Sequence, residues 1–122
     1  MYNEIMSSIC VVVTDFLKAN TGEDLSDIIQ EVIIKNPNRV IFFPDGEYCL
    51  AKPILTSANP KKSVCLHLSN YAVIKAINSR DSDEALIRLG ALEPYNNVEI
   101  NGSNYYLSGG IIDGNNVANG VL

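Results

Sequence analysis

Residues 40–50 have the sequence VIFFPDGEYCL, which gives the clearest indication of the fold. Its first four residues are apolar and β-prone, and they predict a short strand. The next three, Pro44-Asp45-Gly46, predict a tight turn, because proline presets the turn entry and glycine permits a positive φ. Residues 47–50 then predict a second strand. The stretch is therefore two short strands joined by one corner.

The chain after residue 50 continues this pattern of short extended segments broken by turn residues. No second helical stripe of apolar residues follows Arg39, so we expect only β-structure beyond it. Besides 40–43 and 47–50, strands are predicted at residues 64–68, 72–77, 85–89, 97–100, 105–107 and 110–112.

Upstream of residue 40 the pattern is different. Residues 8–14 are rich in isoleucine and valine and predict a first strand. Asp24 is the expected N-cap of an amphipathic helix. The helix would bury an apolar stripe with helical spacing and end at Asn36-Pro37, because proline cannot donate a hydrogen bond within a helix. The stripe consists of Leu25, Ile28, Ile29, Val32 and Ile33.

Short strands separated by polar turns can build a sandwich, a barrel or a solenoid. Two features favour the solenoid. The one helix precedes the later strands, where a terminal cap belongs. The last three residues, Gly120-Val121-Leu122, have no polar side chain. We expect residues 1–122 to form a single segment, with a helical cap at about 24–35 and coils at about 39–122, as part of a longer protein.

The order of these segments resembles the N-terminal region of the pectin-lyase-like right-handed parallel β-helix superfamily, which includes polygalacturonases, pectate lyases and phage tailspikes. The motifs that carry the resemblance cover nearly the whole chain. They are VVVTDF at 11–16, EDLSDIIQ at 23–30, VIFFPDGEY at 40–48, LHL at 66–68, AVIKA at 72–76 and GIIDGNN at 110–116. The family's usual glycine-rich turn after Asp-Phe is LKANTG here, at residues 17–22, which departs from the pattern.

The resemblance implies a mainly β, right-handed parallel β-helix with one N-terminal capping α-helix. It further implies the N-terminal portion of a carbohydrate-active protein, a glycoside hydrolase or polysaccharide lyase whose catalytic residues lie several coils later, outside this chain. Two alternatives stay open. One is a tailspike or surface-attachment module, and the other is a small protein that self-associates through its open C-terminal coil.

Charge and hydropathy narrow the expected partners. The net charge is −5, and the only adjacent basic pair is Lys61-Lys62, so we expect no nucleic-acid partner. No apolar run approaches the roughly 20 residues needed to cross a bilayer, and we expect no membrane partner. The first ten residues contain Glu4 and no basic residue, unlike a secretory signal. Either the protein is intracellular or its signal has been removed.

Three cysteines, Cys10, Cys49 and Cys65, lie far apart among strand-like neighbours. Their spacing fits no zinc pattern, and His67 is the only further soft ligand, so we expect no metal site and no cofactor. We expect all three to be buried free thiols, because free cysteine packs as a small hydrophobic residue.

Catalytic candidates are weak. His67 lies between Leu66 and Leu68 and is expected on the opposite, solvent side of their strand, without a partner that the sequence identifies. Asp113 lacks the second carboxylate that glycoside hydrolysis uses, so we expect a structural corner there. The acidic group at Asp81, Asp83 and Glu84 lacks the glycine of a calcium loop and is expected to be solvated. We therefore assign no catalytic residue.

Three tyrosines are the candidate carbohydrate-binding residues. The faces of Tyr95, Tyr105 and Tyr106 could stack on the rings of a polysaccharide, and they could equally pack along a coil or form an interface. The sequence alone does not separate these roles.

Overall fold

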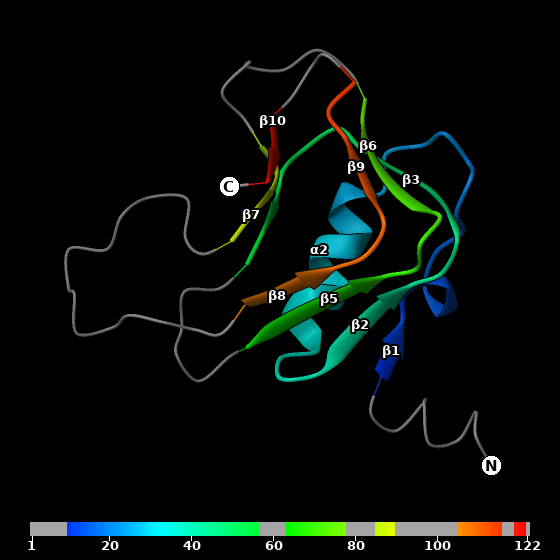
Figure 1. The fold of residues 1–122 in the computed structure, drawn as a ribbon. Coiled ribbons are helices and arrows are strands. Elements are labelled where there is room, and N and C mark those ends of the chain that lie inside the picture. The colour runs from blue at the N-terminus through cyan, green and yellow to red at the C-terminus, as the bar shows by residue number, and fades with distance from the viewer. Residues whose placement is uncertain (1–9, 57–62, 78–84, 90–104, 116–118, 122) are drawn as a thin grey trace, which may run out of the picture.

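The computed structural model describes residues 10–56, 63–77, 85–89, 105–115 and 119–121 (Figure 1). These residues are mainly strand, as the sequence predicts. In chain order the elements are β1 (Cys10–Val12), the 3₁₀ helix η1 (Val13–Asp15), α2 (Ser26–Lys35), β2 (Val40–Phe43), β3 (Gly46–Leu50), β4 (Ile54–Leu55), β5 (Val64–Leu68), β6 (Ala72–Ala76), β7 (Ala85–Arg88), β8 (Tyr105–Ser108), β9 (Ile111–Asp113) and β10 (Asn119–Val121).

The strands form three sheets, and every pairing between them is parallel. The strand orders are β1-β2-β5-β8, β3-β6-β9 and β4-β7-β10. From β2 onward the chain visits the three sheets in rotation, so each strand pairs with the third strand after it. The first full circuit takes 25 residues, the separation between Asn38 and its hydrogen-bond partner Ser63.

Alternate side chains of each strand fill the space between the sheets. Ile41 of β2 lies beside Leu66 of β5, and Tyr48 of β3 lies beside Ile74 of β6, and all four are buried. Burial of each such side chain contributes roughly 1.5–3 kcal/mol. The edge of the Tyr48 ring also meets Phe43, with ring centroids 5.3 Å apart. The core is one continuous column along the stack.

Most predicted strands agree with the structure to within one residue at either end. The prediction for residues 8–14 was wrong in its last two residues, because the strand ends at Val12 and Val13 begins the 3₁₀ helix. Two strands, β4 and β10, were not predicted at all. Each has only two or three residues, too few to show a period. The strand predicted at 97–100 lies outside the described residues.

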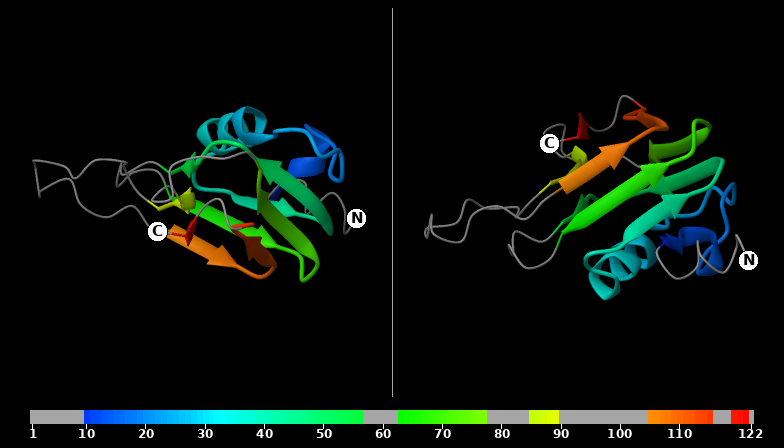
Figure 2. Two further views of the ribbon diagram at one scale, coloured as in Figure 1. Left: turned by 90° about the horizontal axis from the view of Figure 1, so that it is seen from above. Right: turned by 60° about the horizontal axis from the view of Figure 1, so that its bottom comes forward.

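Helix α2 lies over one end of this column, as a cap would (Figure 2). Two details of the prediction were wrong. The N-cap is Leu25, while Asp24 precedes it and accepts a hydrogen bond from the Ser26 N–H at 3.0 Å. Ile28 is 40% exposed, because the helix packs on the strands through the side that carries Ile29 and Ile33. Ile28 points about 100° away from Ile29 around the helix axis.

The helix also hydrogen-bonds the backbone edge of β4. The carboxamide of Gln30 donates from Nε2 to the carbonyl of Leu55 and accepts at Oε1 from the N–H of the same residue, both at 2.8 Å. A neighbouring strand would make the same two bonds. Gln30 therefore takes the place of a missing strand at this edge.

The preceding loop does the same for β3. Asn20 donates its backbone N–H to the carbonyl of Glu47 and accepts the Glu47 N–H at Oδ1, each at 2.8 Å. Leu25 donates to the carbonyl of Cys49 at 2.8 Å. Beyond β3, the carboxylate of Asp24 accepts from the Ala51 N–H at 2.9 Å. The first edges of two sheets are thus closed by segments that are not strands.

Replacing Gln30 by methionine should lower the free energy of unfolding by about 1–3 kcal/mol, because both polar groups of Leu55 would lose their partner. Urea unfolding followed by circular dichroism measures this loss. The control is Glu31→Met at the next position, where the exposed side chain pairs with Lys35 of the same helix. Equal losses in the two variants would contradict the bridging role of Gln30.

Asp24 should make stability depend on pH in the acid range. Burial acts to raise the pKa of its carboxyl, but hydrogen bonds from Ala51 and Ser26 together outweigh it and hold the pKa below the usual 3.8. Because the folded-state pKa is the lower one, the stabilisation is complete above about pH 4 and is lost as the pH falls through the folded value. The free energy of unfolding that Asp24→Asn loses relative to wild type should therefore be larger at pH 6 than at pH 3. Urea unfolding at the two pH values measures this difference. Glu23→Gln, at the exposed neighbouring position, gives the baseline.

Candidate functional site

The outward face of the sheet β1-β2-β5-β8 carries the candidate site. Side chains that alternate with the core residues form two rows across its strands. Strand register places Val40, Cys65 and Tyr106 in one row, and Phe42, His67 and Ser108 in the next. The rows are separated by two residues along the strands, or roughly 6.6 Å.

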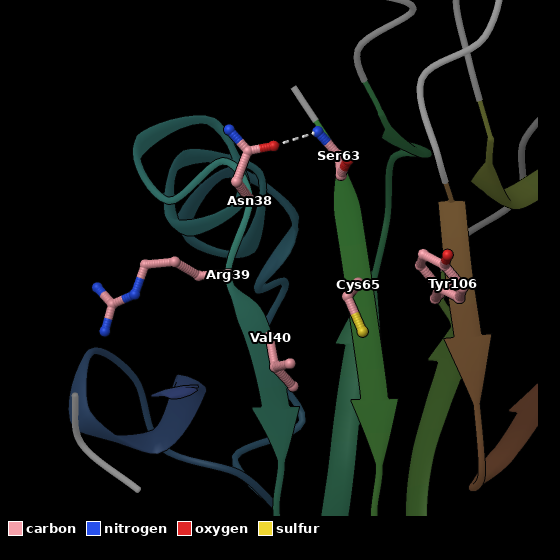
Figure 3. Close-up of a pocket in the computed structure, with 6 residues that line it drawn as sticks. All are labelled: Asn38, Arg39, Val40, Ser63, Cys65 and Tyr106. Atoms are coloured by element: carbon pink, nitrogen blue, oxygen red, sulfur yellow. Dashed lines mark hydrogen bonds between the residues drawn. The ribbon is translucent and has the colours of Figure 1, made fainter. Parts of the chain in front are cut away.

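A hollow of about 350 Å³ opens on the first row (Figure 3). Val40 and Cys65 provide its apolar wall on β2 and β5, and Tyr106 stands on β8. Asn38 and Ser63 provide its polar end. The backbone and stem of Arg39 also line the hollow, but Figure 3 shows its guanidinium pointing away from Tyr106, and it donates to Asn36 at 3.3 Å. The groups that surround the hollow are therefore largely uncharged.

The polar end of the hollow is held by a pair of coil-to-coil hydrogen bonds. Asn38 donates its backbone N–H to the carbonyl of Ser63 at 2.9 Å and accepts the Ser63 N–H at Oδ1, 2.7 Å away. Its φ of 62° is left-handed, a conformation that asparagine tolerates better than most residues. This arrangement fixes the amide of Asn38 at the mouth of the hollow.

The second row contains the only histidine. His67 is exposed, as predicted, and its ring stacks on Phe42 with centroids 5.6 Å apart and an interplanar angle of 28°. Its Nδ1 lies 2.8 Å from the Oγ of Ser108. Activation of a serine needs a histidine that a third group orients, and among the described residues no carboxylate hydrogen-bonds His67. Among the described residues the pair is therefore a polar surface contact.

The structure separates the three candidate tyrosines. Tyr106 is 60% exposed and lines the hollow. Tyr105 lies on the opposite face of β8, beside the buried Val64, and packs against the core. Tyr95 lies outside the described residues. Of the two described, Tyr106 has its ring open to a ligand.

The acidic candidates do not form a site in the described part of the chain. Asp113 accepts a hydrogen bond from the Asn115 N–H at 2.8 Å, which holds the corner after β9. Asp81, Asp83 and Glu84 lie outside the described residues. No group of three or more histidine, cysteine or acidic residues able to hold a metal ion is found among the described residues.

The cysteines are free, but the expectation that all three are buried was wrong for Cys65. Its side chain is half-exposed, because it faces outward where the hollow opens. Cys10 and Cys49 are buried. Burial raises the pKa of the Cys10 thiol, an effect that Arg39 opposes. Burial also raises the pKa of the Cys49 thiol, and the nearby Glu47 adds to it.

Sequence reasoning missed six residues of this face, which are Asn38, Arg39, Val40, Phe42, Ser63 and Ser108. A signal for Phe42 was present. The alternation that buries Ile41 and Phe43 turns Phe42 outward, and one circuit of 25 residues places it beside His67. Asn38 and Ser63 look like ordinary loop residues in the sequence, and only their backbone contacts identify them.

Comparison with known proteins does not assign this face: no family model, curated protein or solved structure matches the chain. None of the described helices is long and apolar enough to cross a bilayer.

The three thiols should react at different rates with a maleimide under native conditions. We expect Cys65 to react first, because it is half-exposed, while Cys10 and Cys49 are buried and have raised pKa values. Peptide mass spectrometry after timed labelling identifies the modified residue. Cys65→Ser should remove the fast phase, and a fast phase that persists in this variant would contradict the placement of the thiols.

Proposed function

We propose that this chain forms the capped opening coils of a right-handed parallel β-helix. Support comes from the rotation of the chain through three parallel sheets and from the constant neighbour relation between each strand and the third one after it. Each circuit of such a solenoid buries its inner face only against its neighbours, so its first circuit needs a cap. Helix α2 and its preceding loop occupy that position.

The function that fits this architecture best is that of the N-terminal portion of a carbohydrate-active protein, a glycoside hydrolase or polysaccharide lyase. The described residues bind polysaccharide and perform no chemistry, and the catalytic residues lie outside this chain. The observation that carries the proposal is the exposed ring of Tyr106 beside a hollow with uncharged polar groups. An aromatic face and a few hydrogen-bonding groups are what a sugar ring requires.

The composition of the hollow favours a neutral sugar over an acidic one. Asn38 and Ser63 offer uncharged hydrogen-bonding groups, whereas the guanidinium of Arg39 is turned away. An acidic sugar that bound here would move its carboxylate out of water without gaining a charged partner, which is unfavourable. Phe42 and His67 lie next to the hollow and give a longer chain a second aromatic surface.

Tyr106→Ala should weaken oligosaccharide binding about 5-fold, since loss of an aromatic stacking contact costs about 1 kcal/mol. Titration of neutral and acidic oligosaccharides, followed by NMR or calorimetry, measures the affinity. Tyr71→Ala is the matched control, because Tyr71 is 73% exposed but lies in the turn before β6.

Protection of Cys65 from maleimide gives a second readout, because this thiol lines the hollow. A bound oligosaccharide should slow its labelling in wild type and slow it less in Tyr106→Ala. The proposal fails if no oligosaccharide binds, or if Tyr71→Ala weakens binding as much as Tyr106→Ala. Preference for acidic oligosaccharides would overturn the assignment of a neutral sugar.

A further inference from the structure

Groups that can hydrogen-bond a sugar lie on two sides of Tyr106 along the strands of the outward face. The polar end of the hollow precedes the first row (Figure 3). The second row, which contains His67 and Ser108, follows the first at roughly 6.6 Å. Across the strands, the described neighbours of Tyr106 are Cys65 and Val40, which form the apolar wall. A sugar chain that runs along the strands therefore passes hydrogen-bonding groups before and after Tyr106, whereas one that runs across them meets the apolar wall.

The imidazole of His67 is held in one orientation from two sides. Its ring stacks on Phe42 with centroids 5.6 Å apart, and its Nδ1 lies 2.8 Å from the Oγ of Ser108. His67 and Ser108 are nevertheless both exposed. Binding to side chains that are already ordered costs less conformational entropy than binding to free ones. The second row is therefore organised before a ligand arrives.

The pair formed by His67 and Ser108 keeps hydrogen-bonding capacity for a ligand. A neutral imidazole with one nitrogen engaged donates or accepts through the other, and a hydroxyl has one donor and two acceptor lone pairs. The described residues offer no partner to the Nε2 of His67. Sugar hydroxyls both donate and accept, so they match either tautomer of the ring. An exposed, ordered and unsaturated polar pair beside an aromatic hollow has the properties of a second subsite.

We propose that His67 and Ser108 form a second sugar subsite next to the one at Tyr106, and that the polysaccharide runs along the strands from the polar end of the hollow to the second row. Phe42 is a positioning residue, because it holds the imidazole by stacking. A pyranose unit is slightly shorter than the row spacing of roughly 6.6 Å, so the ligand is at least a trisaccharide. This inference rests on the proposed function, since it extends the same site.

The imidazole itself reports on the second subsite. His67 is the only histidine of the chain, so it gives a single set of imidazole signals in NMR spectra. The probes are β-1,4-linked oligosaccharides of glucose, mannose, galactose and xylose, from one to four units. At constant pH, a trisaccharide that binds should shift the imidazole signals, whereas the monosaccharide at Tyr106 should leave them unchanged. The trisaccharide should also bind about 5-fold more tightly, as one added hydrogen bond allows.

Substitutions in the second row should affect long ligands selectively. Ser108→Ala should weaken trisaccharide binding about 5-fold and leave monosaccharide binding unchanged, because it removes one hydrogen-bonding group. Ser108→Thr keeps the hydroxyl and should retain the affinity. Phe42→Leu should move the imidazole signals of the free protein and also weaken the trisaccharide. The matched control is Tyr71→Phe, which removes an exposed hydroxyl outside both rows.

The failure of this inference differs from the failure of the proposed function. If no oligosaccharide of the series binds, the proposed function fails, and the second subsite fails with it. If a trisaccharide binds and Tyr106→Ala weakens it, but the imidazole signals stay in place and Ser108→Ala binds as wild type does, the sugar site stands and the second subsite is overturned. Equal losses in Ser108→Ala and Tyr71→Phe would overturn it as well.

Discussion

The structure depends on closing the backbone edge of the first circuit. A parallel coil stack hydrogen-bonds each strand through its neighbours, so its first strands have no partner on one side. Gln30 supplies that partner to β4 through both atoms of its carboxamide, and Asn20 supplies it to β3 through its own backbone and side chain. Each uses a polar side chain as a substitute for a strand. Once these edges are occupied, every later circuit can form on the one before it.

The same coil-to-coil bonds set the geometry of the outward face. Between Asn38 and Ser63 the separation is 25 residues, whereas between His67 and Ser108 it is 41. The second interval contains two stretches outside the described residues. The strands on either side of it nevertheless keep their register, so a longer circuit does not disturb the rows. Insertions can therefore change what lies between the strands while Tyr106 stays beside Cys65.

The sequence predicts the parts of this fold that apolar patterning determines. Strand β5 alternates with period two, and helix α2 has an apolar stripe, so both were identified within a residue or two. The remainder depends on contacts between circuits. The two residues of β4 form a strand because β7 lies beside them, and Ile28 is exposed because the helix faces the strands with the side that carries Ile29 and Ile33. For the site, Tyr106 was among the candidates, but the 41-residue interval hid its position over Cys65. Asn38 and Ser63 gave no signal, since their role is a pair of hydrogen bonds between circuits that only the fold brings together.

The two faces of a strand give Tyr48 and Tyr106 different roles. Tyr48 points inward, is fully buried, and donates its hydroxyl to the carbonyl of Pro44 at 2.7 Å. Burial, with a further contribution from Asp45, raises its pKa to about 12. That hydroxyl satisfies a backbone group in the corner between β2 and β3. Tyr106 lies on the other face of its sheet, where no core packing constrains its ring. A shift of one residue in the pairing of a strand would turn its inward side chains outward and its outward side chains inward, because successive side chains of a strand point to opposite faces. The pairing of β5 with β8, which places Tyr106 beside Cys65, therefore keeps this aromatic ring on the outward face of the sheet.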